Sequence, residues 1–150
     1  MNTPEMLLWG LRLAGVGQLF VAGIYFWVRG ILGWRADLEK LRPHNRAIAH
    51  TYSRYIQVIN TVFGLICLFQ TRELLNGTVL AADLTLLMGC YWLMRLILQF
   101  LYYDVREITA RRRLYYYGVY AFDLLFILQT APLLAGFVYN LHALAGGCHG

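Results

Sequence analysis

The sequence predicts an all-α integral membrane protein, a four-helix bundle. Its 150 residues are 59% hydrophobic and 14% charged, with a mean hydropathy of +0.51. A soluble domain of this length has too small a core to bury so much apolar surface. Four apolar segments are also long enough to cross about 30 Å of hydrocarbon as helices. Because these segments are continuous rather than alternating, they favour helices over barrel strands.

The predicted helices form a single domain over residues 1–150. The first lacks the basic start and the cleavage pattern of a signal peptide, so we expect it to be retained. A polar loop from Arg35 to Arg46 precedes the second helix. The fourth contains Pro132, which removes a backbone hydrogen bond and predicts a kink. The predicted spans are roughly residues 6–33, 47–70, 79–103 and 114–140.

The basic residues predict the orientation of the bundle. Eight of the thirteen Lys and Arg residues lie in two loops on the same side, and the opposite connection has only Arg72. The positive-inside rule therefore predicts cytoplasmic basic loops and both termini outside, as in a bacterial inner membrane. The net charge of +5 then reflects contact with membrane lipids rather than nucleic-acid binding. The two loops contain Arg35, Lys40, Arg42 and Arg46, and Arg106, Arg111, Arg112 and Arg113.

Three charged residues lie well inside predicted spans, away from the span ends where Arg12, Arg29 and Asp83 lie. Arg54, Arg95 and Asp123 are expected about 10, 12 and 13 Å from the cytoplasmic ends of their helices, at the helical rise of about 1.5 Å per residue. An ionised group at that depth is costly unless it is paired or hydrated. Arginine stems can reach the interface, but the short aspartate cannot. We therefore expect Asp123 to meet Arg54, Arg95 or both across the bundle.

Polar residues at helical spacing surround these charges. His50 and Gln57 share a face with Arg54, Tyr91 and Gln99 share one with Arg95, and Tyr116 and Tyr120 share one with Asp123. Three such stripes predict a charged pocket in the cytoplasmic leaflet. The pocket would suit a lipid phosphate or a quinone headgroup. The same residues also fit a structural hydrogen-bond network or a proton path.

Metal, redox and hydrolytic chemistry have weak sequence support. No C-x-x-C motif joins the three cysteines, and His50, the only histidine in a span, would need a partner chain to complete haem ligation. Ser53 is the only serine and has no G-x-S-x-G context. The tail offers three weak metal-ligand candidates, His142, Cys148 and His149, at a spacing typical of no zinc motif.

The preferred prediction is a non-enzymatic accessory or anchor subunit that binds a lipid or quinone and forms a homo-oligomer or joins other membrane subunits. In size and shape alone the chain resembles anchor subunits of respiratory complexes. The first alternative is a small transporter or proton-coupled channel in which Asp123 titrates. The second is a redox or haem-carrying subunit.

Overall fold

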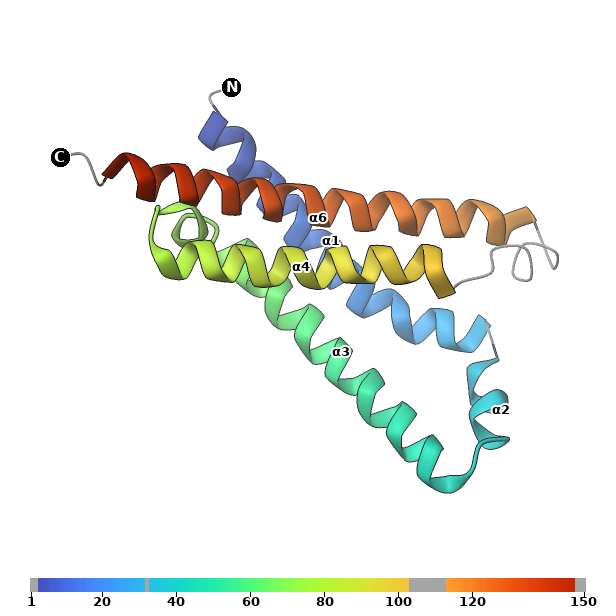
Figure 1. Ribbon diagram of the computed structural model, residues 1–150. Helices are drawn as coiled ribbons and strands as arrows, with labels where there is room; N and C mark the ends of the chain where they lie inside the picture. The colour runs from blue at the N-terminus through green and yellow to red at the C-terminus, as the bar shows by residue number, and fades with distance from the viewer. Residues whose placement is uncertain (1–2, 32, 103–112, 148–150) are drawn as a thin grey trace.

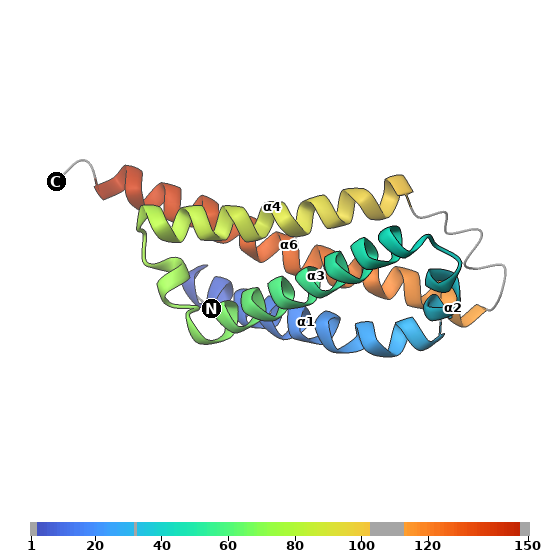
Figure 2. The ribbon, with the colours of Figure 1, turned by 90° about the horizontal axis from the view of Figure 1, so that it is seen from below.

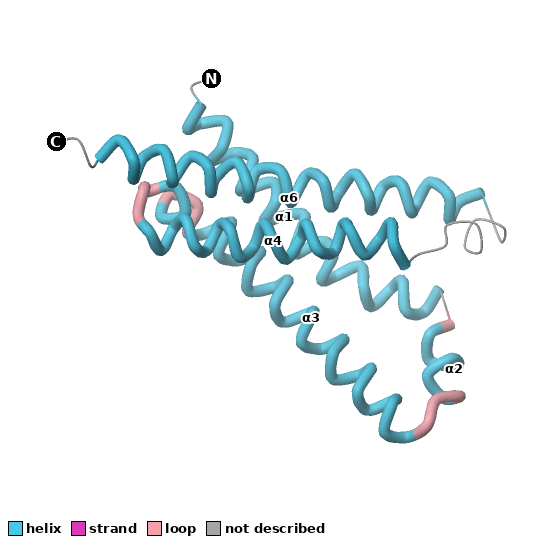
Figure 3. The backbone as a smooth tube through the Cα atoms, in the orientation of Figure 1, coloured by secondary structure: helices cyan, strands magenta, loops and turns pink. Residues whose placement is uncertain are grey.

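The computed structural model describes residues 3–31, 33–102 and 113–147. The described ranges are helical apart from short turns and contain no strand, which confirms the predicted all-α class (Figures 1 and 3). The long helices are α1 (Thr3–Ile31), α3 (Pro43–Phe69), α4 (Val79–Tyr102) and α6 (Arg113–Gly147). The short elements are α2 (Trp34–Glu39) and the 3₁₀ helix η1 (Glu73–Leu75).

All four long helices are long and apolar enough to cross a membrane. Their outer surfaces expose large hydrophobic side chains, including Phe69 at 77%, Leu101 at 72% and Phe20 at 54% exposure. Such a belt suits hydrocarbon chains rather than water. The structure therefore supports the predicted multi-pass membrane protein.

The spanning helices are arranged as two contacting pairs. α4 packs along α6, whereas α1 packs against both α3 and α6. Towards the end of the bundle that holds α2, α3 diverges from α4 (Figure 1). The two ends of the chain lie near η1, at the opposite end from α2 (Figure 2). This divergence decides which of the predicted polar residues can meet.

The bundle interior is a mixed aliphatic and aromatic core. Trp92 of α4 lies against Phe126 of α6, with 5.6 Å between ring centres. Tyr91, at the edge of this core, donates a 2.8 Å hydrogen bond to Asn60 Oδ1 and so links α4 to α3. The buried core cluster comprises Leu11, Cys67, Leu74, Met88, Trp92, Phe126 and Leu133.

Glycines allow the closest helix crossings. A Cβ atom added at Gly15 of α1 would lie 2.9 Å from the carbonyl oxygen of Gly64 on α3, so the two backbones nearly touch. Gly10 of the same helix packs against Pro132 of α6, where an added Cβ would lie 3.1 Å from the proline Cβ. Small residues permit such close approach in membranes, where packing replaces the hydrophobic drive between helices.

The segment expected to be a polar loop between the first two spans contains α2. Gly33 turns the chain with a positive φ of 64°, a conformation that suits glycine. Leu38 is 4% exposed, and α2 contacts both α1 and α3. The loop prediction missed this helix because six residues, of which only Leu38 is buried, leave little periodicity to detect.

The connection between α3 and α4 is tied to α6 by Asn140. Its side chain is fully buried. It accepts a 3.0 Å hydrogen bond from the Gly77 amide and donates a 2.8 Å bond to the Leu74 carbonyl oxygen. Thr78 then begins α4 by accepting a 3.2 Å bond from the Ala81 amide. α6 continues to Gly147, beyond the predicted end at residue 140.

Candidate functional site: the α1–α3 seam

Basic side chains gather in a cleft at the α2 end of the seam between α1 and α3. The cleft has a volume of about 430 Å³. The turn at Gly33 folds α2 back against both helices, which brings residues of three elements together. The lining residues are Arg29, Arg35, Leu38, Glu39, Arg46 and His50.

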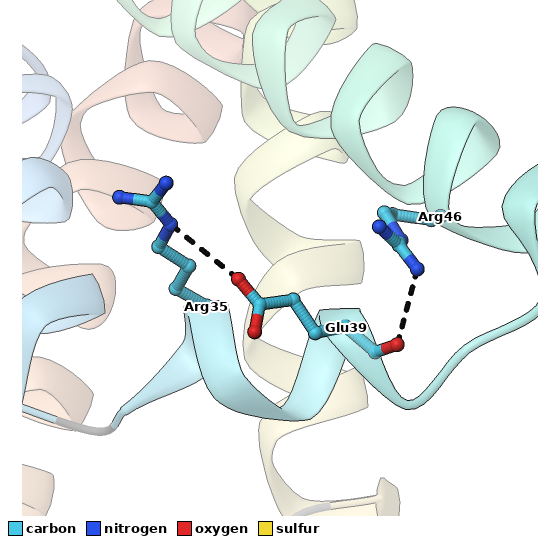
Figure 4. A network of polar contacts seen from close by, with 3 residues as sticks. All are labelled: Arg35, Glu39 and Arg46. Atoms are coloured by element: carbon cyan, nitrogen blue, oxygen red, sulfur yellow. Dashed lines mark hydrogen bonds and ion pairs between the residues drawn. The ribbon is translucent and has the colours of Figure 1, made fainter.

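Two arginines bracket the end of α2. The Arg35 Nε atom lies 3.6 Å from Glu39 Oε1, and Arg46 Nη2 donates a 3.0 Å hydrogen bond to the Glu39 carbonyl oxygen (Figure 4). Arg46 also donates to the Leu41 carbonyl oxygen at 3.4 Å. Carbonyl groups at a helix end are otherwise unpaired, so Arg46 fastens α2 to the start of α3.

The third arginine is held by aromatic rings. The Arg29 guanidinium carbon lies 5.4 Å from the ring centre of Tyr25 and 5.0 Å from that of Trp34. Such cation–π contacts orient a guanidinium without neutralising it. The cleft therefore carries three guanidinium groups against one carboxylate, with His50 beside them.

An apolar groove lies further along the same seam. Its volume is about 470 Å³. Gly23 has no side chain to fill the groove, and nothing lies within 4 Å of a Cβ atom added there. Phe26 precedes Arg29 by one helical turn, so the groove leads towards the basic cleft. The groove is lined by Leu19, Ala22, Gly23, Phe26, Gln57, Val58, Thr61 and Val62.

A second polar group lies between α4 and α6. The Arg95 Nη1 atom donates a 3.2 Å hydrogen bond to Gln99 Oε1, and its guanidinium carbon lies 4.9 Å from the Phe126 ring centre. Asp123 lies one helical turn before Phe126, the ring that Arg95 contacts. Asp123 Oδ1 is buried and has no hydrogen-bond partner among the described residues. The structure thus places Arg95, Gln99 and Asp123 in one neighbourhood.

The remaining predicted residues lie elsewhere. Arg54 is exposed on α3, and within the described ranges no hydrogen bond or ion pair joins it to Asp123. His50 lines the basic cleft, and Gln57 lines the apolar groove. Tyr91 bonds to Asn60, and Tyr120 is exposed. The structure divides the predicted pocket residues among the α1–α3 seam, the contact between α4 and α6, the Tyr91–Asn60 link and the exposed surface.

Some of the predicted site residues lie outside the part of the chain that the structure describes. The side chain of Tyr116, the basic loop at 106–112, and the tail residues Cys148 and His149 lie outside the described residues. His142, the described member of the weak metal-ligand set, is exposed, and its Nδ1 atom lies 2.8 Å from the Val138 carbonyl oxygen.

Sequence reasoning missed several buried polar residues. Gln18 and Gln129 are fully buried, and Asn60 is 2% exposed. Gln18 stands alone in an apolar stretch, whereas Asn60 and Gln129 adjoin the threonines Thr61 and Thr130. A single amide in a membrane span is itself informative, because burying it requires a partner.

No protein-family model, curated protein or solved structure matches this chain. The fold gives the class of the described residues: an all-helical protein with four helices long and apolar enough to span a bilayer.

Proposed function

We propose that this protein is a non-enzymatic membrane subunit that binds an anionic, lipid-like amphiphile along the α1–α3 seam. The phosphate headgroup occupies the basic cleft, and an acyl chain follows the apolar groove. The observation that carries this proposal is the succession of cleft and groove along one helix pair. Ligand sites of membrane-facing proteins need this combination of polar anchoring groups and apolar walls.

The chemistry of the cleft favours a phosphate over a quinone headgroup. Guanidinium groups form charge-assisted, often bidentate bonds to phosphate oxygens. Glu39 offsets one of the three arginines that line the cleft, and the remaining positive charge suits an anion. A neutral quinone carbonyl would gain less from the same groups.

The proposed orientation places the cleft at the cytoplasmic headgroup level. α2 and the basic residues around it lie at the opposite end of the bundle from η1 and the chain termini (Figure 1). The positive-inside rule assigns such a basic end to the cytoplasm, here of a bacterial inner membrane. Anionic lipids of the cytoplasmic leaflet would then reach the arginines directly.

Arg54 supports a role within a larger assembly. It is an exposed cation on a spanning helix, and burial against lipid would be costly unless its stem reaches the interface. A second protein surface, from another copy or a different subunit, would supply counter-charge or hydrogen-bond acceptors. We therefore propose an accessory or anchor subunit rather than an isolated protein.

Blocking the seam should remove bound lipid without unfolding the protein. Gly23→Trp fills the groove where an added Cβ meets nothing within 4 Å, and the double variant Arg29→Gln, Arg35→Gln removes two cleft charges. Native mass spectrometry of protein released from phosphatidylglycerol nanodiscs should show lipid adducts in the wild type and severalfold fewer in both variants. Arg72→Gln, an exposed arginine at the other end of the chain's bundle, is the matched control and should retain them.

Equal adduct occupancy in all four proteins would contradict the seam as the lipid site. Loss of adducts in the double arginine variant, with no loss in Gly23→Trp, would restrict the site to the headgroup. A circular dichroism spectrum for each variant establishes that the helices remain folded.

A proton-coupled transporter is the second candidate, favoured by the buried Asp123 Oδ1, which has no hydrogen-bond partner among the described residues and lies one helical turn from the ring that Arg95 contacts. We expect Asp123→Asn to cause no change in proton flux across liposomes, because the lipid-binding function requires none. Asp83→Asn, an exposed carboxylate on α4, is the control. Proton flux in the wild type that disappears in Asp123→Asn but persists in Asp83→Asn would instead establish the transporter.

A further inference from the structure

Four buried side chains, one from each spanning helix, are linked through neighbouring contacts in the bundle interior. We name these residues the amide layer: Gln18 of α1, Cys67 of α3, Trp92 of α4 and Gln129 of α6. Gln18, Cys67 and Gln129 are fully buried, and Trp92 is 1% exposed. The amide layer lies in the interior of the bundle and is therefore distinct from the α1–α3 seam, which opens on the surface.

Contacts connect the members of the amide layer. Gln18 Nε2 donates a 3.7 Å hydrogen bond to Cys67 Sγ. The Gln129 amide packs against Gly17, the neighbour of Gln18, since a Cβ atom added at Gly17 would lie 3.0 Å from Gln129 Nε2. Trp92 lies against Phe126, one helical turn before Gln129. Gln129 therefore lies beside the stretch of α1 that carries Gln18, and Trp92 contacts the ring of Phe126, one turn away on α6.

Most of the hydrogen-bonding capacity of this layer is unmet. Gln18 Oε1, both side-chain polar atoms of Gln129 and Trp92 Nε1 are buried without a partner among the described residues. A buried polar group left unpaired costs about 1–3 kcal/mol. The unmet set includes acceptors and donors and carries no formal charge. A molecule that binds there must therefore both donate and accept hydrogen bonds.

We propose that the amide layer binds a small cluster of water molecules in the interior of the bundle. Water both donates and accepts, so it satisfies the Gln18 and Gln129 oxygens as well as the Trp92 and Gln129 N–H groups. A quinone carbonyl would only accept and would leave both amide oxygens unpaired. A metal cation would find no carboxylate in the layer. The hydrated layer extends polar character along α6 by six residues, about 9 Å, from Asp123.

Hydroxyl-radical footprinting in nanodiscs tests this proposal, because X-ray pulses generate radicals from bound water beside reactive side chains. Trp92 should be oxidised in the wild type despite its burial, and the added oxygen should carry ¹⁸O after brief exchange into H₂¹⁸O. Oxidation of Trp92 should fall severalfold in Gln18→Leu and in Gln129→Leu. His44, which is exposed at the start of α3 near the basic end of the bundle, reports the radical dose in the surrounding water.

The control variant is Thr85→Val. Thr85 is fully buried, but its hydroxyl already donates to the Ala81 carbonyl oxygen at 2.7 Å, so its removal should leave Trp92 oxidation unchanged. An unoxidised Trp92 in the wild type would overturn the proposal, even if the glutamine variants fail to fold. An increase in thermal stability on Gln129→Leu would also overturn it, because replacing a dry, unpaired amide by hydrocarbon removes a penalty.

Discussion

Gly15→Leu is expected to force α1 away from α3 and to lower the free energy of unfolding by about 3 kcal/mol, the upper range for overpacking a tight contact. A Cβ atom at this position would lie 2.9 Å from the Gly64 carbonyl oxygen and 3.0 Å from Cys67 Cβ. Backbone atoms cannot yield as a flexible side chain does. Unfolding of the purified protein by SDS in mixed micelles, followed by circular dichroism, measures the change.

Gly23→Leu is the matched control on the same helix. Nothing lies within 4 Å of a Cβ atom added there, so we expect a change within about 0.5 kcal/mol, as at other open surface positions. Equal stability of the Gly15 and Gly23 variants would contradict the close α1–α3 crossing. Because Gly23 lines the apolar groove proposed to hold an acyl chain, the control also separates stability from lipid binding.

Asn140→Leu should be similarly harmful, with an expected loss of about 2–4 kcal/mol from two backbone groups left unpaired, one buried and one partly buried. The variant removes the acceptor of the Gly77 amide and the donor to the Leu74 carbonyl oxygen. Leucine also lacks the shape to restore either bond. Denaturation in mixed micelles gives the loss of stability, and hydrogen exchange read by mass spectrometry should show faster exchange of the Gly77 amide.

Asn45→Leu is the same chemical change at an exposed site near the start of α3. It should leave both stability and Gly77 exchange close to the wild-type values. Unchanged Gly77 protection in Asn140→Leu would mean that Asn140 does not hold the connection between α3 and α4.

Run length and composition were sufficient to predict the all-α class and the four long apolar helices. These features depend on the thickness of the bilayer, which any continuous apolar stretch of about 20 residues satisfies. α2 was missed because its burial depends on one residue, Leu38. Asn140 was predicted to end the last span. In the structure α6 continues to Gly147, and Asn140 bonds from within this helix to the connection that contains η1.

The candidate site was less predictable, because helical periodicity assigns residues to faces but not faces to partners. His50, Arg54 and Gln57 were expected to meet α4 and α6. In the structure, His50 and Gln57 face the α1–α3 seam, and Arg54 is exposed. The pairing of α3 with α1 depends on the Gly15–Gly64 crossing, and small residues are too common in membrane helices to identify one crossing from sequence.

The same crossing has a consequence for biosynthesis. α3 has the lowest mean hydropathy of the four spanning helices and carries Arg54, and an arginine at a helix centre opposes translocon-mediated insertion by about 2.5–3.5 kcal/mol. α1 is made immediately before α3 and offers a glycine surface that fits it closely. We therefore expect the nascent chain to enter the bilayer as two helical hairpins. The first pairs α1 with α3, and the second pairs α4 with α6.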